Sequence, residues 1–162
     1  MRNINTRFIA RGGFIAALYV VLTLVSAAFG LSSGVIQIRL SEMLCILPCF
    51  TASAVPGLFI GCIIANLITG SVIWDTVFGS IATLAAAYLS YLLRKNRYLA
   101  SVPPVVTNAI AVPLLLKYAY GVPGNPWYFA LTVAAGELIS AGVLGQLLYS
   151  LAERRTGNGK LQ

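Results

Sequence analysis

The sequence predicts an all-α integral membrane protein, a single domain over residues 1–162 in which six transmembrane helices form one bundle with both termini cytoplasmic. Hydrophobic residues make up 59% of the chain and charged residues 9%, whereas about a quarter of a soluble domain is charged. Several apolar runs reach the length of about 20 residues that a membrane-spanning helix needs. The basic residues gather in clusters beside these runs. A lipid bilayer is the solvent that explains all three observations.

The composition also narrows the chemistry. The chain has no histidine, and its only carboxylate side chains are those of Glu42, Asp75, Glu137 and Glu153. No run matches a Walker A phosphate loop, so we do not expect the chain to hydrolyse ATP itself. The net charge of +7 fits basic cytoplasmic flanks better than nucleic-acid binding, because basic and aromatic residues are not interleaved on a polar surface. We therefore expect no enzyme, no catalytic residue, no metal or other cofactor and no nucleic-acid partner.

The three cysteines lie in apolar segments, and we interpret them as packing residues rather than as metal ligands or a redox pair. Two thiols on one helix face, without further ligands, make a poor zinc site.

The first predicted helix spans residues 10–30 and follows a basic N-terminal segment. This layout also resembles a secretory signal, with residues 26–28 as its cleavage site. The apolar run is longer than the hydrophobic region of a signal peptide, which has about 7–15 residues. We therefore expect a helix that is retained in the membrane.

The last three helices are predicted at residues 74–94, 99–119 and 126–152. Basic residues follow the first and the third of these, and three prolines interrupt the second.

The stretch of residues 43–69 is too long for one helix and too short for two full ones. Cytoplasmic loops collect Lys and Arg, and an even number of crossings between the first and second basic clusters keeps both on one side. We therefore divide the stretch near Pro48 and Pro56 into a short helix at 41–49 and a longer one at 54–70. The basic residues that this topology places on the cytoplasmic side are Arg2, Arg7, Arg11, Arg94, Lys95, Arg97, Arg154, Arg155 and Lys160.

The same topology places residues 31–41, 69–74 and 118–126 on the outer side, together with Arg39 and Lys117. Lys117 either contacts substrate or extends to the outer interface. Aromatic residues that mark this interface are expected at Trp74, Trp127 and Tyr128.

Glu137 is the strongest candidate for a functional residue. It lies near the middle of the last helix without a neighbouring cation, and an ionisable group inside a bilayer costs about 2.5–3.5 kcal/mol. It must therefore face the bundle, a partner or a cavity, and we favour a substrate role over packing.

Four further polar residues have two interpretations each. Glu42 and Asp75 follow helix starts, where a carboxylate either complements the helix dipole or binds a ligand; Arg39 could pair with Glu42. Asn66 and Asn108 lie deep in their helices and either join helices by hydrogen bonds or contact the ligand.

Residues 35–41 alternate between apolar and polar side chains. An extended chain would place Gln37, Arg39 and Ser41 on one face. The segment is either a strand-like lid with a polar underside or an extended connector at the interface.

Small residues four apart let helices approach closely. On the first helix Gly13 and Ala17 form one such pair, and Gly12 and Ala16 form another. Such pairs serve internal packing or the docking of another subunit.

Residues 36–93 resemble the queuosine-precursor transporter (QueT) family, whose members are substrate-binding S components of energy-coupling factor (ECF) transporters. The resemblance rests on Arg39-Leu40-Ser41-Glu42, Leu47-Pro48, Pro56-Gly57-Leu58-Phe59, Gly61, Asn66, Asp75 and Phe78-Gly79. It implies a six-helix S component in the plasma membrane of a prokaryote, which captures a 7-deazaguanine from outside. It also implies three partner subunits, namely a transmembrane coupling subunit and two ATPases. In S components a small-residue element on the first helix contacts the coupling subunit, and Gly13-xxx-Ala17 or Gly12-xxx-Ala16 matches it here.

The polar residues suit such a ligand. A guanine-like edge offers an N–H and an amino group to one carboxylate, and an aminomethyl group requires a second carboxylate as counter-ion. We assign Glu137 to the edge and Glu42 or Asp75 to the amine, with Asn66, Asn108 and Arg39 orienting the ring and an aromatic ring such as that of Trp74 stacking on it. The alternatives are an S component for another vitamin-like solute and a small secondary transporter that works alone.

Overall fold

The computed structural model describes residues 5–31 and 37–156, and within these ranges the chain is all-helical. This confirms that the fold is all-α, whereas the six crossings and the orientation of the termini stay predictions. The helices in chain order are α1 (Thr6–Ala28), η1 (Leu40–Cys49), α2 (Ala54–Ile68), α3 (Ile73–Leu92), α4 (Arg97–Ala100), α5 (Val102–Tyr118), α6 (Pro126–Glu137), η2 (Leu138–Leu144) and α7 (Gly145–Thr156).

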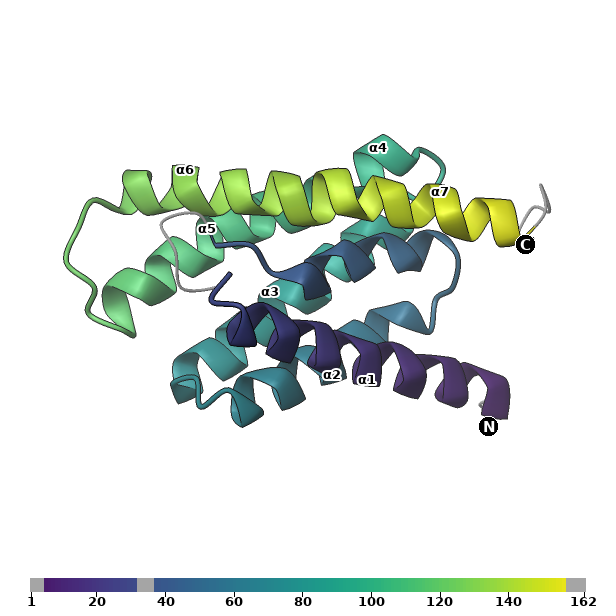
Figure 1. The fold of residues 1–162 in the computed structure, drawn as a ribbon, viewed down its shortest axis with the longest axis horizontal. Coiled ribbons are helices and arrows are strands. Elements are labelled where there is room, and N and C mark those ends of the chain that lie inside the picture. The colour runs from purple at the N-terminus through teal and green to yellow at the C-terminus, as the bar shows by residue number, and fades with distance from the viewer. Residues whose placement is uncertain (1–4, 32–36, 157–162) are drawn as a thin grey trace.

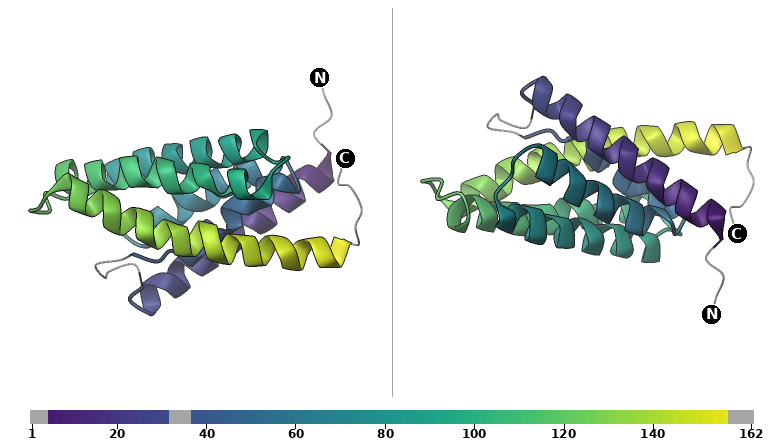
Figure 2. Two further views of the ribbon diagram at one scale, coloured as in Figure 1. Left: turned by 90° about the horizontal axis from the view of Figure 1, so that it is seen from above. Right: turned by 90° about the horizontal axis from the view of Figure 1, so that it is seen from below.

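The helices form one elongated bundle (Figure 1). The rod α6–η2–α7 runs along one side, α1 and α2 lie on the opposite side, and η1 lies between them. The α1 helix crosses the bundle obliquely, as both views of Figure 2 show. Both ends of the chain lie at the same end of the bundle, and the α5–α6 loop lies at the other end.

Among the described residues, four helical stretches are long and apolar enough to cross a membrane: Thr6–Ala28, Ile73–Leu92, Arg97–Tyr118 and Pro126–Arg154. Leu40–Cys49 and Ala54–Ile68 are apolar but shorter, with 10 and 15 residues. The protein is thus a multi-pass membrane protein by its helices, whereas the count of six crossings stays a prediction.

Three of the predicted helices are irregular in ways that the sequence explains only in part. The stretch 99–119 is divided between α4 and α5, because Pro103 and Pro104 favour the first turn of a new helix. The last helix contains a π-helical segment, η2, which begins directly after Glu137. The short segment η1 is a 3₁₀-helix rather than an α-helix.

Glycines allow α1 and α2 to cross almost backbone to backbone. A Cβ atom on Gly57 would lie 2.6 Å from the Gly12 carbonyl oxygen, and one on Gly61 would lie 2.9 Å from the Ala16 carbonyl oxygen. Gly12 and Ala16 are therefore used for internal packing. The neighbouring pair differs, because Gly13 has open space around its Cβ position and Ala17 is exposed.

The distribution of side chains is that of a protein in lipid. Large apolar side chains such as Phe14, Leu131 and Val143 are 65–72% exposed, and these positions suit contact with acyl chains. The carboxylates and amides that the sequence analysis singled out are instead buried: Glu42, Asn66, Asp75, Asn108 and Glu137.

Apart from Arg39 and Lys117, the basic residues of the described chain lie toward the end of the bundle that carries the two chain ends. Arg97 of α4 forms an ion pair of 3.9 Å with Glu153 of α7, and the Gln146 amide donates to the Arg97 carbonyl oxygen at 2.8 Å. Arg97 therefore lies beside the C-terminal helix, and the α3–α4 connection with Arg94 and Lys95 lies toward the same end of the bundle as the two chain ends (Figure 1). Arg2 and Lys160, which belong to the predicted clusters, lie outside the described residues.

Candidate functional site

A polar cavity of about 330 Å³ lies at the end of the bundle away from the chain termini. It lies within the range of about 300–1,000 Å³ that is typical of small-molecule sites. Four helices and three connections line it, with the residues Thr23, Ser26, Ala27, Gln37, Arg39, Asn66, Thr69, Ser71, Asp75, Val112, Leu115, Leu116 and Tyr120.

Asp75 is the one acidic residue among those that line the cavity. It lies in the first turn of α3 and is 7% exposed. The Tyr120 hydroxyl donates to its Oδ2 atom at 2.7 Å. Burial raises the pKa of Tyr120, and so does the hydrogen bond to Asp75, so the phenol remains a proton donor near neutral pH. Among the described residues no hydrogen bond engages the other carboxylate oxygen, Oδ1, which lies beside Gly79 on the next turn of α3.

Asn66 approaches Asp75 from α2. Its amide donates to the Asp75 backbone carbonyl at 3.4 Å and to Cys62 Sγ at 3.7 Å. The side chain thus joins α2 to the start of α3 and also lines the cavity. Helix joining and ligand contact are compatible at this position.

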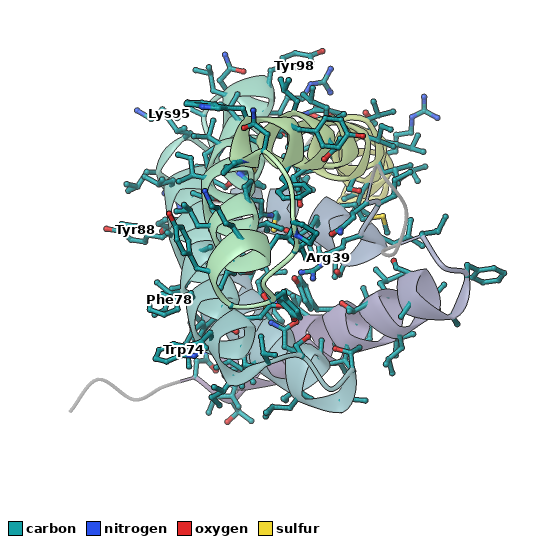
Figure 3. All side chains as sticks on the ribbon, turned by 90° about the vertical axis from the view of Figure 1, so that its left-hand side faces the viewer. Arg39, Trp74, Phe78, Tyr88, Lys95 and Tyr98 are labelled. Carbon is teal, nitrogen blue, oxygen red and sulfur yellow. The ribbon has the colours of Figure 1, made fainter. Side chains whose placement is uncertain are left out.

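Arg39 lies near the centre of the bundle in the view from the cavity end (Figure 3). Within the described chain, no carboxylate lies within 4.0 Å of its guanidinium group. The group nevertheless interacts electrostatically with Asp75, Glu42 and Glu137. Arg39 therefore links the cavity to the two acids that do not line it.

Glu42 is fully engaged by protein donors. The Tyr19 hydroxyl donates to Glu42 Oε1 at 2.6 Å, and the Cys45 thiol donates to Oε2 at 3.2 Å. The direct Arg39–Glu42 ion pair considered from the sequence is not formed, because Tyr19 reaches the carboxylate first from α1. Glu42 is 1% exposed and does not line the cavity.

Glu137 faces the bundle interior, in agreement with the expectation from its insertion cost. It is 5% exposed, and the Asn108 amide of α5 donates to its Oε1 atom at 2.8 Å. Its Oε2 atom is buried without a hydrogen-bond partner among the described residues. A buried carboxylate oxygen without a donor is costly, and a ligand donor would satisfy it.

Trp74 and Lys117 are not brought to this cavity. Trp74 is 58% exposed and stacks on Phe78 on the flank of α3, with ring centroids 5.9 Å apart (Figure 3). One residue along a helix turns the side chain by about 100°, so the inward direction of Asp75 turns Trp74 toward the surface. The Lys117 ammonium group lies 5.6 Å from the Tyr118 ring centroid on the exposed end of α5.

The segment before η1 is extended but forms no strand within residues 37–39. Gln37 and Arg39 both line the cavity, as the alternation suggests, whereas Ser41 lies in η1 and contacts the Thr23 hydroxyl at 2.9 Å. Residues 35 and 36 of the expected strand lie outside the described residues.

Sequence reasoning missed three side chains that organise the site: Tyr19, Ser26 and Tyr120. Each holds a group that lies far away in the sequence, namely Glu42, the backbone of Leu40 and Asp75. The partial signal in the sequence was the presence of a tyrosine and a serine inside the mostly apolar run of the first helix.

Comparison with known proteins identifies the family. The family model described as "QueT transporter" matches residues 9–154. A curated relative, the queuosine precursor transporter QueT of Lactococcus lactis subsp. cremoris (strain MG1363), is 36% identical over 94 residues. That alignment covers 57% of this chain and 54% of the relative, so the chain matches about half the length of the relative. No solved structure matches the chain. Because the family model covers most of the sequence, this membrane protein belongs to the QueT transporter family.

Proposed function

We propose that this protein is the substrate-binding S component of an ECF-type importer and that it captures a 7-deazaguanine precursor of queuosine from outside the cell. A separate transmembrane coupling subunit and two ATPases supply the energy, and the protein lies in the plasma membrane of a prokaryote. The observation that carries the proposal is the cavity itself, in which Asp75 and Arg39 are held inside a bundle with an apolar exterior. The family and the name of the relative support the substrate class.

The proposed topology has six crossings and cytoplasmic termini. Cytoplasmic loops are rich in Lys and Arg, and Arg94, Lys95 and Arg97 lie at the same end of the bundle as the two chain termini. The cavity lies at the opposite end, so in this orientation it opens to the outside.

The ligand groups match the groups in and below the cavity. Asp75 is the counter-ion for an aminomethyl group, because Glu42 already accepts from Tyr19 and Cys45. The Arg39 guanidinium donates to the ring carbonyl oxygen, and Asn66 orients the ring from α2. Glu137 and Asn108 lie outside the cavity lining, so in this proposal the bound ligand extends beyond the cavity toward them. Glu137 then accepts the N–H and amino edge through its unpartnered oxygen, with Asn108 holding its other oxygen. Each hydrogen bond to a charged group contributes about 1.5–3 kcal/mol.

The experiment that tests the proposal separates capture from transport. Purified protein in detergent should bind 7-aminomethyl- or 7-cyano-7-deazaguanine in isothermal titration calorimetry, and mass spectrometry should detect the bound compound. The same protein alone in proteoliposomes should not accumulate it. Uptake by the chain alone, driven by a proton or sodium gradient, would identify a secondary transporter instead. Binding of an unrelated vitamin in place of the deazaguanine would identify a different S component.

The Gly13–Ala17 face of α1 is the proposed docking surface for the coupling subunit. Gly12 and Ala16 are occupied by α2, whereas Gly13 and Ala17 remain open on the exposed face. Close helix approach in membranes uses small residues at such positions.

Gly13→Leu is therefore expected to leave ligand affinity unchanged and to reduce uptake at least about tenfold in proteoliposomes that contain the complete transporter. Ala85→Leu is the matched control, since it enlarges an exposed small residue on α3 and should preserve uptake. Normal uptake by Gly13→Leu would remove this face from the docking surface.

A further inference from the structure

The backbone that carries Arg39 into the cavity is fixed from two sides. Residues 37–39 precede η1 without regular secondary structure, and Arg39 itself has an extended backbone. The Leu40 N–H group donates to the Ser26 Oγ atom of α1 at 2.9 Å. On the opposite side the segment rests against α6 at Gly136, where a Cβ atom would overlap the Gln37 carbonyl group.

We propose that Ser26 and Gly136 are positioning residues for ligand binding, which set the place of the Arg39 guanidinium in the cavity. This inference rests on the proposed function, because it takes the cavity as the ligand site.

Ser26 is suited to hold the backbone rather than the ligand. It is fully buried, and its hydroxyl donates to the Leu22 carbonyl oxygen at 2.9 Å while it accepts from Leu40. The single hydroxyl proton is thus used in the hydrogen bond to Leu22 within α1. Ser26 is among the residues that line the cavity, but its hydroxyl forms the connection between α1 and the start of η1.

Gly136 acts through the absence of a side chain. Its Cβ position coincides with backbone atoms of Gln37, and backbone atoms cannot move aside as a flexible side chain can. Any larger residue therefore displaces the segment 37–39 away from α6, and Arg39 moves with it. Gly142 on the same rod is the natural comparison, since a Cβ atom there would meet only Leu138 Cδ2 at 4.0 Å.

The displacement matters because Arg39 is restrained by its backbone more than by its side-chain contacts. No carboxylate within the described chain lies within 4.0 Å of its guanidinium, so no direct ion pair would return the group to its place. Asp75, Glu42 and Glu137 act on it only at longer range. The start of the Arg39 side chain is therefore placed by the backbone contacts of this segment, which are those at Ser26 and Gly136 together with the hydrogen bond of 2.9 Å from the Ile38 N–H group to the Leu31 carbonyl oxygen.

A double-mutant cycle tests the proposal with 7-aminomethyl-7-deazaguanine as the titrated ligand. Losing one charge-assisted hydrogen bond to the ligand corresponds to about tenfold or more in affinity. We expect Gly136→Ala to weaken binding by about this factor and Ser26→Ala to weaken it about fivefold. Gly142→Ala, the matched control, should bind like the wild type.

The decisive readout is the same pair of changes in an Arg39→Ala background. If Ser26 and Gly136 act through Arg39, each change should weaken ligand binding less than about twofold in this background. If they merely support the fold, each change should weaken binding by the same factor in both backgrounds. Equal factors in the two backgrounds, or normal binding by Ser26→Ala, would overturn the inference.

Two features of this experiment distinguish failure of the inference from misfolding of a variant and from failure of the proposed function. Ser26→Ala shortens a side chain without adding volume, so it carries the test if Gly136→Ala does not fold. Wild-type protein that fails to bind the deazaguanine overturns the proposed function and this inference with it. Wild-type binding without coupling to Arg39 overturns the inference alone.

Discussion

Asp75→Asn is expected to weaken binding of 7-aminomethyl-7-deazaguanine by about 10- to 100-fold, which corresponds to the loss of one hydrogen bond to a charged group. The substitution keeps the shape of the side chain and an oxygen that accepts from Tyr120. It removes the negative charge from the one acidic residue that lines the cavity. The effect should therefore come from the ligand and not from a changed fold. Isothermal titration calorimetry measures the affinity, and the thermal midpoint of the ligand-free protein shows whether the fold is preserved.

Two further variants provide comparisons for the loss of affinity expected of Asp75→Asn. Tyr120→Phe removes one donor to Asp75 but leaves the charge, so we expect a smaller loss of about 3- to 10-fold. Glu153→Gln removes a carboxylate whose side chain is 50% exposed near the opposite end of the bundle, and it should not alter binding. Equal affinities for the wild type and Asp75→Asn would exclude Asp75 as the counter-ion of the amine.

A neutral ligand gives an independent check of the same assignment. The cyano compound lacks the cation, so Asp75→Asn should reduce its affinity much less than it reduces the affinity of the aminomethyl compound. A similar loss for both ligands would assign Asp75 to the ring edge instead of the amine.

The positions of the buried acids were predictable because the cost of a charge in lipid is large compared with that of most packing choices. Glu137 had to face inward, and it does. The partners of these acids were not predictable in the same way. Tyr19 and Glu42 are 23 residues apart, and Tyr120 and Asp75 are 45 apart. Such contacts depend on how the helices pack, which the local pattern does not specify.

Three further structural features could not be predicted from the sequence, for physical reasons. Trp74 and Asp75 are neighbours at a helix start, and the pattern alone does not say which of the two faces inward. The π-helical segment after Glu137 has no residue signature of its own, because residues 138–144 also suit an α-helix. The choice between Gly12-xxx-Ala16 and Gly13-xxx-Ala17 depends on the close approach of Gly57 and Gly61 from α2.

Substitutions of the Asn108–Glu137 pair can distinguish a contribution to stability from a role in ligand binding. Its hydrogen bond of 2.8 Å lies inside the bundle, and Glu137 Oε2 has no donor within the described chain. Replacing both partners of a buried polar pair by apolar groups of similar shape is often neutral or stabilising, whereas removing one partner leaves the other unsatisfied. A pair that served only to hold α5 against α6 could therefore be replaced by apolar side chains without loss.

We expect the double variant Asn108→Leu/Glu137→Met to be at least as heat-stable as the wild type without ligand, and to bind the deazaguanine at least about 100-fold more weakly. Glu137→Met alone should lower the free energy of unfolding by about 1–3 kcal/mol, because the Asn108 amide is then buried without an acceptor. Thermal unfolding in detergent and calorimetric titration measure the two quantities on the same samples. A double variant that binds normally would make the pair a structural element of the bundle. A double variant that is stable but does not bind would show that a membrane-buried carboxylate is retained in this chain for its ligand, at the expense of the stability that an apolar pair would provide.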